Sequence, residues 1–135
     1  MPASVKFVGM LLGAGVVAAL ASGIVQHRQQ AAQTRGVAQA ITHGNVDAGK
    51  AAIARYACGA CHIIPGIPSG TGRVGPSLRG MSKRAMIAGK FANAPDDMIR
   101  WIRQPQEMVP GIAMPDQPVT EQEARDIAAY LYTLR

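Results

Sequence analysis

The most informative segment of this sequence is Cys58-Gly59-Ala60-Cys61-His62. The pattern C-x-x-C-H is the attachment signature of a c-type haem. Two thiols add across the two vinyl groups of one porphyrin, so they need to lie a few residues apart on one turn. The next residue, His62, then offers its imidazole to the iron as the proximal ligand. The motif predicts one haem c, bound covalently through Cys58 and Cys61.

Three other interpretations of the cysteine pair fit the rest of the sequence less well. A dithiol redox motif calls for strands alternating with helices, and the sequence lacks that pattern. A zinc site calls for four ligands, but there is no third cysteine, and only His27 and His43 remain besides His62. A disulfide between residues this close would constrain the unfolded chain very little.

Composition indicates a loop-rich domain that needs a staple. The 135 residues include 15 Gly and 9 Pro but only 4% aromatics, so few large side chains are available for a core. A domain of this size is marginal alone, and a covalent haem would supply an apolar plate for the chain to wrap. The net charge of +6 favours acidic partners or a membrane surface. We find no nucleic-acid-binding motif and expect no nucleic-acid partner.

Residues 7–25 carry no charge and are just long enough to span a bilayer as a helix. Two interpretations compete. The segment is either an uncleaved signal anchor or a cleaved signal peptide, since Ala19-Leu20-Ala21 fits the A-x-A cleavage pattern. The apolar stretch continues past that site to Val25, which favours an anchor within residues 1–25. Because c-type haem is attached outside the bacterial inner membrane, we expect a single-pass protein with a periplasmic haem domain.

A Gln- and Ala-rich tether is expected over residues 26–44, and the haem domain over residues 45–135. A tether would keep the haem domain near partners in the same membrane. The first helix of the domain should begin near Asn45 or Asp47, either of which can cap it. It should run through Ile53 and Tyr56 into the haem motif.

Turn residues divide the remainder of the domain. We expect a Pro/Gly-rich loop over residues 63–76, a short helix over 82–88, a helix opening at 93–97 and a Pro-rich loop over 104–118. The last helix follows Thr120-Glu121-Gln122-Glu123, a capping box. Its apolar residues recur at helical spacing, and we expect it to pack on the first helix around Gly49 and Ile53.

An electron-transfer haem needs a sixth ligand, and a methionine thioether is a common choice. The methionines beyond the motif are Met81, Met86, Met98, Met108 and Met114. Met98 lies on a helical apolar stripe with Trp101 and Ile102, so core packing is its expected role. Met114 precedes Pro115, which restricts it to extended geometry suited to a loop ligand. We expect Met114 to be the ligand, with Met108 as the alternative.

Residues 45–135 resemble a class I c-type cytochrome with one haem. Four marks in order carry the resemblance: Cys58 to His62, Gly75-Pro76-Ser77-Leu78-Arg79-Gly80, Met114-Pro115, and a last helix containing Tyr130-Leu131. Ile64-Pro65-Gly66 and Trp101-Ile102-Arg103 look like a proteobacterial membrane-anchored branch associated with respiratory oxidases. The resemblance implies an all-α fold, with crossing first and last helices and loops wrapping one covalent haem. A single transmembrane helix would precede it.

The resemblance also implies roles for individual residues. Pro76 should offer its carbonyl to Nδ1–H of His62, a contact that orients the iron ligand. Met114 should be the sixth ligand. Trp101 should pack beside the haem and donate its indole N–H to a propionate, or else serve only in core packing.

A basic cluster contains no acidic residue: Arg73, Arg79, Lys83, Arg84 and Lys90. It is either an ordinary solvated face or a docking patch around the haem edge, where charge would raise the association rate more than the affinity.

The leading functional hypothesis is a periplasmic single-electron carrier and not an enzyme. It would take electrons from a quinol-oxidising complex or a dehydrogenase and pass them to a haem-copper terminal oxidase, while anchored in the membrane. The alternative is a haem subunit of a membrane oxidase or periplasmic dehydrogenase complex. A haem-based sensor of small ligands is a third hypothesis, but it needs an open sixth position, and Met114-Pro115 argues against one.

Overall fold

The computed structural model describes residues 2–135 and places residues 3–42 in one long helix, α1 (Ala3–Thr42). Among the described residues, this helix alone is long and apolar enough to cross a membrane, a property that a signal sequence shares. Apolar side chains over residues 7–25 are exposed, including Leu12 and Val17. The chain divides into two units between Gln33 and Thr34.

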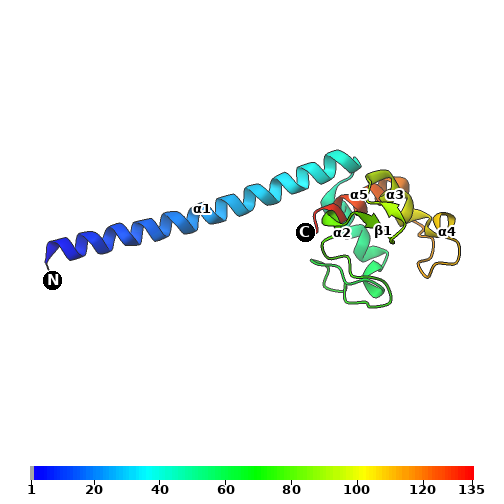
Figure 1. The fold of residues 1–135 in the computed structure, drawn as a ribbon, viewed down its shortest axis with the longest axis horizontal. Coiled ribbons are helices and arrows are strands. Elements are labelled where there is room, and N and C mark those ends of the chain that lie inside the picture. The colour runs from blue at the N-terminus through cyan, green and yellow to red at the C-terminus, as the bar shows by residue number, and fades with distance from the viewer. Residues whose placement is uncertain (1) are drawn as a thin grey trace. The chain divides into compact units, whose positions relative to one another are not determined.

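The second unit contains the remaining elements, which are mostly helical, as the sequence predicted (Figure 1). In chain order they are α2 (Val46–Arg55), η1 (Cys58–Ala60), η2 (Met81–Lys83), β1 (Met86–Ile87), β2 (Phe91–Ala92), α3 (Pro95–Arg103), α4 (Pro105–Met108) and α5 (Glu121–Tyr132).

Helix α2 begins where the sequence predicted, because the side chain of Asn45 caps it. The Asn45 amide oxygen accepts from the backbone N–H groups of Asp47 and Ala48, each at 2.9 Å. These bonds satisfy donors that have no partner inside the helix. The helix ends at Tyr56, and Ala57 follows in a left-handed conformation with φ of 53°. That change of direction carries the chain from the helix into the haem motif.

Helix α5 begins with the predicted capping box. The Thr120 hydroxyl accepts from the Glu123 N–H at 3.2 Å, and the Glu123 carboxylate accepts from the Thr120 N–H at 2.8 Å. Helices α2 and α5 pack together at the centre of the unit (Figure 1). A Cβ at Gly49 would collide with the backbone of Asp126, so only glycine allows this approach. The predicted contact around Gly49 and Ile53 is confirmed, and Ile53 is almost fully buried.

The short helix predicted over residues 82–88 is wrong. The structure has a 3-10 turn, η2, followed by the hairpin of β1 and β2, in which Ile87 pairs with Phe91. Ala88 and Gly89 both have positive φ, as a tight hairpin turn requires. The Asn93 side-chain amide donates to the carbonyls of Met81 and Arg84, each at 2.8 Å. In a helix these carbonyls would accept from backbone N–H groups instead.

Helix α3 begins at Pro95, in agreement with the predicted opening at residues 93–97. The region predicted as a Pro-rich loop, residues 104–118, contains one helical turn, α4, and is otherwise irregular. Proline at the first position of each helix costs no hydrogen bond, because that N–H has no partner in a helix.

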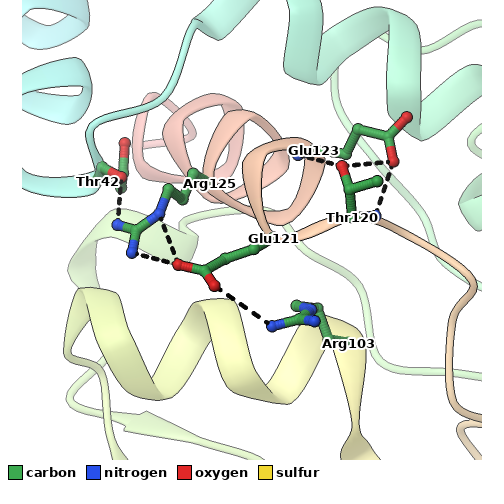
Figure 2. A network of polar contacts seen from close by, with 6 residues as sticks. All are labelled: Thr42, Arg103, Thr120, Glu121, Glu123 and Arg125. Carbon is green, nitrogen blue, oxygen red and sulfur yellow. Dashed lines mark hydrogen bonds and ion pairs between the residues drawn. The ribbon is translucent and has the colours of Figure 1, made fainter.

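The last turns of α1 belong to the same unit as the haem domain. Ala38 and Thr42 are buried, and the Arg125 guanidinium donates to the Thr42 carbonyl at 3.3 Å. Figure 2 shows this contact within a polar network in which Arg125 also pairs with Glu121 at 2.7 Å. Glu121 lies 3.8 Å from Arg103 of α3. The network therefore links the end of α1 to α3 and α5. The domain boundaries predicted from the sequence, at residues 25 and 44, stay predictions.

Candidate haem site

The haem motif forms one tight turn directly after α2. The Cys58 carbonyl accepts from the N–H groups of Cys61 at 3.3 Å and His62 at 3.0 Å. These bonds gather both thiols and the imidazole on η1 and the two residues after it. Cys58 is half-buried and packs against the core, whereas Cys61 is exposed. This local geometry suits attachment of one porphyrin at two neighbouring points.

The Pro/Gly-rich loop of residues 63–76 folds back over the motif. Gly72 N–H donates to the Gly59 carbonyl at 3.0 Å, and Gly75 N–H donates to the Cys61 carbonyl at 2.8 Å. A Cβ at Gly59 would lie 2.6 Å from the Ser69 carbonyl oxygen, so the two segments approach as closely as glycine permits. This return of the chain brings Pro76 to His62.

The His62 ring contacts the end of this loop. Its Nδ1 lies 2.7 Å from the carbonyl oxygen of Pro76, which accepts the hydrogen bond when Nδ1 carries the proton. A Cβ at Gly75 would lie 2.7 Å from Nδ1 and 2.9 Å from Nε2, so the ring rests against a backbone without a side chain. Because Nδ1 is engaged, Nε2 is the ring nitrogen left for a metal, and the role of His62 as iron ligand stays a prediction.

Burial raises the pKa of the Cys58 thiol, with the neighbouring Cys61 adding to the rise and a backbone hydrogen bond opposing it. At neutral pH this thiol is therefore protonated. Addition of a thiol across a vinyl group places the sulfur on one vinyl carbon and the hydrogen on the other, so no atom is left over, and two neighbouring thiols on one turn can each form such a bond to one porphyrin. The cysteines and His62 thus fit a covalent haem.

Helix α5 also supports the loop beside the motif. The Tyr130 hydroxyl donates to the Pro65 carbonyl at 2.6 Å. A Cβ at Gly66 would lie 2.5 Å from the same hydroxyl. Burial raises the pKa of Tyr130, so the phenol stays neutral and keeps donating well above neutral pH. This contact links the last helix to the haem-motif loop, a connection that the sequence did not reveal.

The structure separates the candidate methionine ligands by environment. Met98 is fully buried in the core, as expected, and Met81 is buried there too. Met86 is 45% exposed on β1. Met108 and Met114 are half-buried on the segment between α3 and α5. The assignment of Met114 as the sixth ligand stays a prediction.

Trp101 is half-buried on α3 and packs against the core. Its ring centroid lies 6.0 Å from that of Phe91 in a tilted arrangement, a separation typical of attractive aromatic pairs. The structure therefore shows the packing role, and the propionate contact stays a prediction.

The residues of the basic cluster differ in their contacts. The Arg84 guanidinium donates to the carbonyls of Ser77 and Arg79, at 3.1 Å for Arg79. It therefore secures the turn that follows Pro76. Arg73, Arg79, Lys83 and Lys90 are exposed. Sequence inspection alone gave no signal that separates Arg84 from these four residues.

Comparison with known proteins agrees with this geometry. The cytochrome c family model matches residues 46–135. Cytochrome c2 of Rhodopila globiformis is 38% identical over 80 residues, which cover 49% of this chain and 74% of that protein. Cytochrome c oxidase subunit 2 of Alkalihalophilus pseudofirmus is 32% identical over 88 residues, 64% of this chain but only 25% of the subunit. No solved structure matches the chain.

A helical domain that presents two cysteines and an oriented histidine on one turn defines a class I c-type cytochrome. The chain belongs to the cytochrome c family, whose model covers α2 to the C-terminal residue. Members of this family carry electrons on a covalently bound haem.

Proposed function

We propose that this protein is a membrane-anchored, single-electron carrier with one haem c and His62/Met114 ligation. It would act in the periplasm between a quinol-oxidising complex or dehydrogenase and a haem-copper terminal oxidase. The observation that carries the proposal is the 2.7 Å contact between His62 Nδ1 and the Pro76 carbonyl, on a turn with both cysteines. The contact fixes the orientation of the His62 ring, as the ligation proposed here requires.

When bound, haem supplies a one-electron couple between ferric and ferrous iron. Cys58 and Cys61 would hold the porphyrin, and His62 would ligate the iron through Nε2. The Pro76 carbonyl keeps the His62 ring fixed, which limits rearrangement as the charge on the iron changes. Met114 would fill the sixth position and exclude external ligands. A site closed on both sides passes electrons without making or breaking a substrate bond.

The far-red absorption of the ferric protein tests the ligand set. We expect a methionine–iron charge-transfer band in wild type and its loss in Met114→Ala, with wild-type absorption retained in Met108→Ala. After reduction, carbon monoxide should bind Met114→Ala and not wild type. Carbon monoxide binding to wild type would contradict the closed site and favour a sensor.

A membrane anchor is supported by the exposed apolar residues 7–25 of α1, which water solvates poorly. Fractionation tests it directly. If the segment stays attached, haem-stained protein should remain in the membrane fraction after a high-salt wash and leave it only with detergent. Recovery in the soluble periplasmic fraction, with a mature N-terminus after Ala21, would show a cleaved signal peptide.

The alternative function is a haem subunit of a larger oxidase or dehydrogenase. The observation that supports this alternative is the similarity over 88 residues to an oxidase subunit. Purification in mild detergent distinguishes the two functions: stoichiometric co-purification with oxidase subunits supports the alternative, and isolation as a single chain supports the carrier.

Electron transfer to a purified terminal oxidase tests the exposed cations Arg73, Arg79, Lys83 and Lys90 as a docking patch. A docking role predicts that the second-order rate falls steeply with added salt, because salt screens charges beyond about 10 Å at 0.1 M. A rate independent of salt would leave the cluster as an ordinary solvated face.

A further inference from the structure

The segment that follows α3 forms a closed loop around one glutamine. At its base, the Gln117 N–H donates to the Arg103 carbonyl at 3.0 Å. The Gln106 N–H donates to the Asp116 carboxylate, also at 3.0 Å. These two hydrogen bonds hold the two ends of the loop together, as in an Ω-loop. Met114 lies on this loop, between α4 and its base.

The side chain of Gln106 reaches across the loop. Its Nε2 donates to the carbonyls of Ile112 and Met114, each at 2.6 Å. Its Oε1 accepts from the Gly111 N–H at 3.1 Å. All three contacts fit the same orientation of the Gln106 amide. The two carbonyls accept from its NH₂ group, and the Gly111 N–H donates to its oxygen. Both amide protons and the amide oxygen are used.

The backbone around Met114 has little other support. Within residues 2–135, Gln106 provides the only side-chain hydrogen bonds to the backbone of residues 111–114. Gly111 turns the chain with φ of 82°, and Pro115 lacks a backbone donor. The neighbouring Gln117 side-chain amide donates to the Pro115 carbonyl at 2.9 Å, which lies outside residues 111–114. The conformation at Met114 therefore depends on Gln106.

We propose that Gln106 is a positioning residue for the sixth haem ligand. Its amide fixes the backbone of Met114 and keeps the thioether presented to the iron. The inference rests on the proposed function, in which Met114 is that ligand. Gln106 itself does not touch the iron and acts through the loop.

Loss of the amide should let the loop open more often. External ligands bind only the open form, so their apparent affinity rises in proportion to the open fraction. Removing a pair of neutral hydrogen bonds shifts such an equilibrium by about tenfold or more. We therefore expect imidazole to bind the ferric Gln106→Ala protein about tenfold more tightly than wild type. The far-red methionine–iron band should weaken in the same variant.

The experiment uses the haem-loaded full chain and four variants. Gln106→Ala removes the amide, and Gln106→Glu keeps its length but replaces both donors with an acceptor facing two carbonyls. Gln122→Ala is the matched control, because the Gln122 amide also donates twice, to the His43 carbonyl at 3.3 Å and Asp126 at 2.9 Å. Met114→Ala reports on the ligand itself. Each protein is titrated with imidazole when ferric and with carbon monoxide when ferrous.

Tighter imidazole binding in both Gln106 variants, with wild-type binding in Gln122→Ala, would support the proposal. Wild-type binding in the Gln106 variants, with tighter binding in Met114→Ala, would overturn the positioning role and leave the proposed ligand intact. An equal increase in imidazole affinity in Gln122→Ala would also overturn the positioning role, because it would show that general destabilisation opens the site. An unchanged band in Met114→Ala would overturn the ligand assignment and the inference together. If Gln106→Ala does not fold, Gln106→Glu decides.

Discussion

At the scale of single residues, Gly75 determines how closely the chain approaches His62, the proposed iron ligand. The nearest ring atoms of His62 leave no room for a Cβ at this position. We expect Gly75→Ala to displace the ring, weaken its contact with Pro76 and destabilise the haem-loaded protein by about 1–3 kcal/mol. Denaturant unfolding measures the loss, and potentiometry should show a shifted reduction potential.

Gly36→Ala is the matched control for this substitution, because nothing lies within 4 Å of a Cβ at Gly36 on α1. There the change should stabilise slightly, since alanine favours helix over glycine by about 0.5–1 kcal/mol. Wild-type stability and potential in Gly75→Ala would show that the loop yields without disturbing His62.

Tyr132 supplies a pH dependence whose sign can be derived. Burial, with a contribution from Asp97, raises the pKa of Tyr132 to about 12 from its ordinary value of 10.0. The fold therefore favours the neutral phenol, which donates to the Asn93 side chain at 3.0 Å. This stabilisation is complete below pH 10.0 and is lost as the pH rises through about 12.

The Tyr132→Phe variant tests that dependence. Below pH 10.0 it should be less stable than wild type by about 1 kcal/mol, because the hydrogen bond to Asn93 is gone. The difference should shrink as the pH approaches 12, since only wild type loses a neutral phenol. Unfolding free energies measured across this range give both curves. A constant difference would mean that Tyr132 does not titrate with unfolding.

The individual residues of the site differ in how far the sequence reveals them. Cys58, Cys61 and His62 follow from one local motif, and Pro76 follows from a resemblance carried by adjacent residues. Gln106 has no such signal, because its hydrogen bonds exist only once residues 111–114 have turned back toward α4. Arg84 appeared in the sequence as one cation among five, and only the folded turn reveals its carbonyl partners.

At the scale of elements, the N-terminus of α5 depends on its capping box. The Glu123 pKa lies below its ordinary value of 4.5, chiefly because its carboxylate accepts from the Thr120 backbone N–H and then from the hydroxyl. We expect Thr120→Ala to lower the unfolding free energy by about 1 kcal/mol near neutral pH, and Thr120→Ser to retain most of the stability.

Acid should reduce the effect of Thr120→Ala. A carboxylate with a lowered pKa stabilises the fold above pH 4.5, and that stabilisation is lost as the pH falls through the folded-state pKa. The difference between wild type and Thr120→Ala should therefore narrow in acid. Denaturant unfolding at neutral and acidic pH checks this, and a difference that grows in acid would contradict the role given to Glu123.

Elements with local start signals were predictable, and the element shaped by distant contacts was not. Asn45, the Thr120 box and Pro95 each fix a helix start through bonds or backbone restrictions within a few residues. The segment after Gly80 has a composition that suits a helix. The side-chain amide of Asn93, which follows the hairpin, instead donates hydrogen bonds to the carbonyls of Met81 and Arg84. Tertiary hydrogen bonds thus override propensity over residues 82–88.

At the scale of the whole molecule, composition predicted a domain with few aromatic residues and a need for additional stabilisation. Part of that stabilisation comes from residues that the sequence assigned to the tether. Ala38 and Thr42 are buried, and the Thr42 hydroxyl donates to the Ala38 carbonyl at 2.7 Å. Gln- and Ala-rich composition does not predict this docking, because small apolar residues serve equally well in a solvated helix.

Shortening the chain tests whether these residues belong to the folding unit. Two shortened proteins, beginning at Thr34 and at Asn45, would be exported behind the same cleavable signal and loaded with haem. The protein that begins at Asn45 lacks the contacts of Ala38 and the Arg125 bond to Thr42. Its unfolding free energy should therefore be about 2 kcal/mol lower than that of the protein that begins at Thr34. The visible spectra should be identical, because the haem residues are unchanged.

Arg35→Ala in the full chain tests whether apolar packing or charge stabilises the contacts of residues 34–42. Arg35 pairs with Asp47 at 2.6 Å, but the two side chains are 41% and 76% exposed. An ion pair in that setting contributes less than about 1 kcal/mol. A large loss in Arg35→Ala would assign the docking of residues 34–42 to electrostatics, and high salt should then reproduce it. Equal stability of the two shortened proteins would instead place the start of the folding unit at Asn45, leaving the preceding turns of α1 as tether.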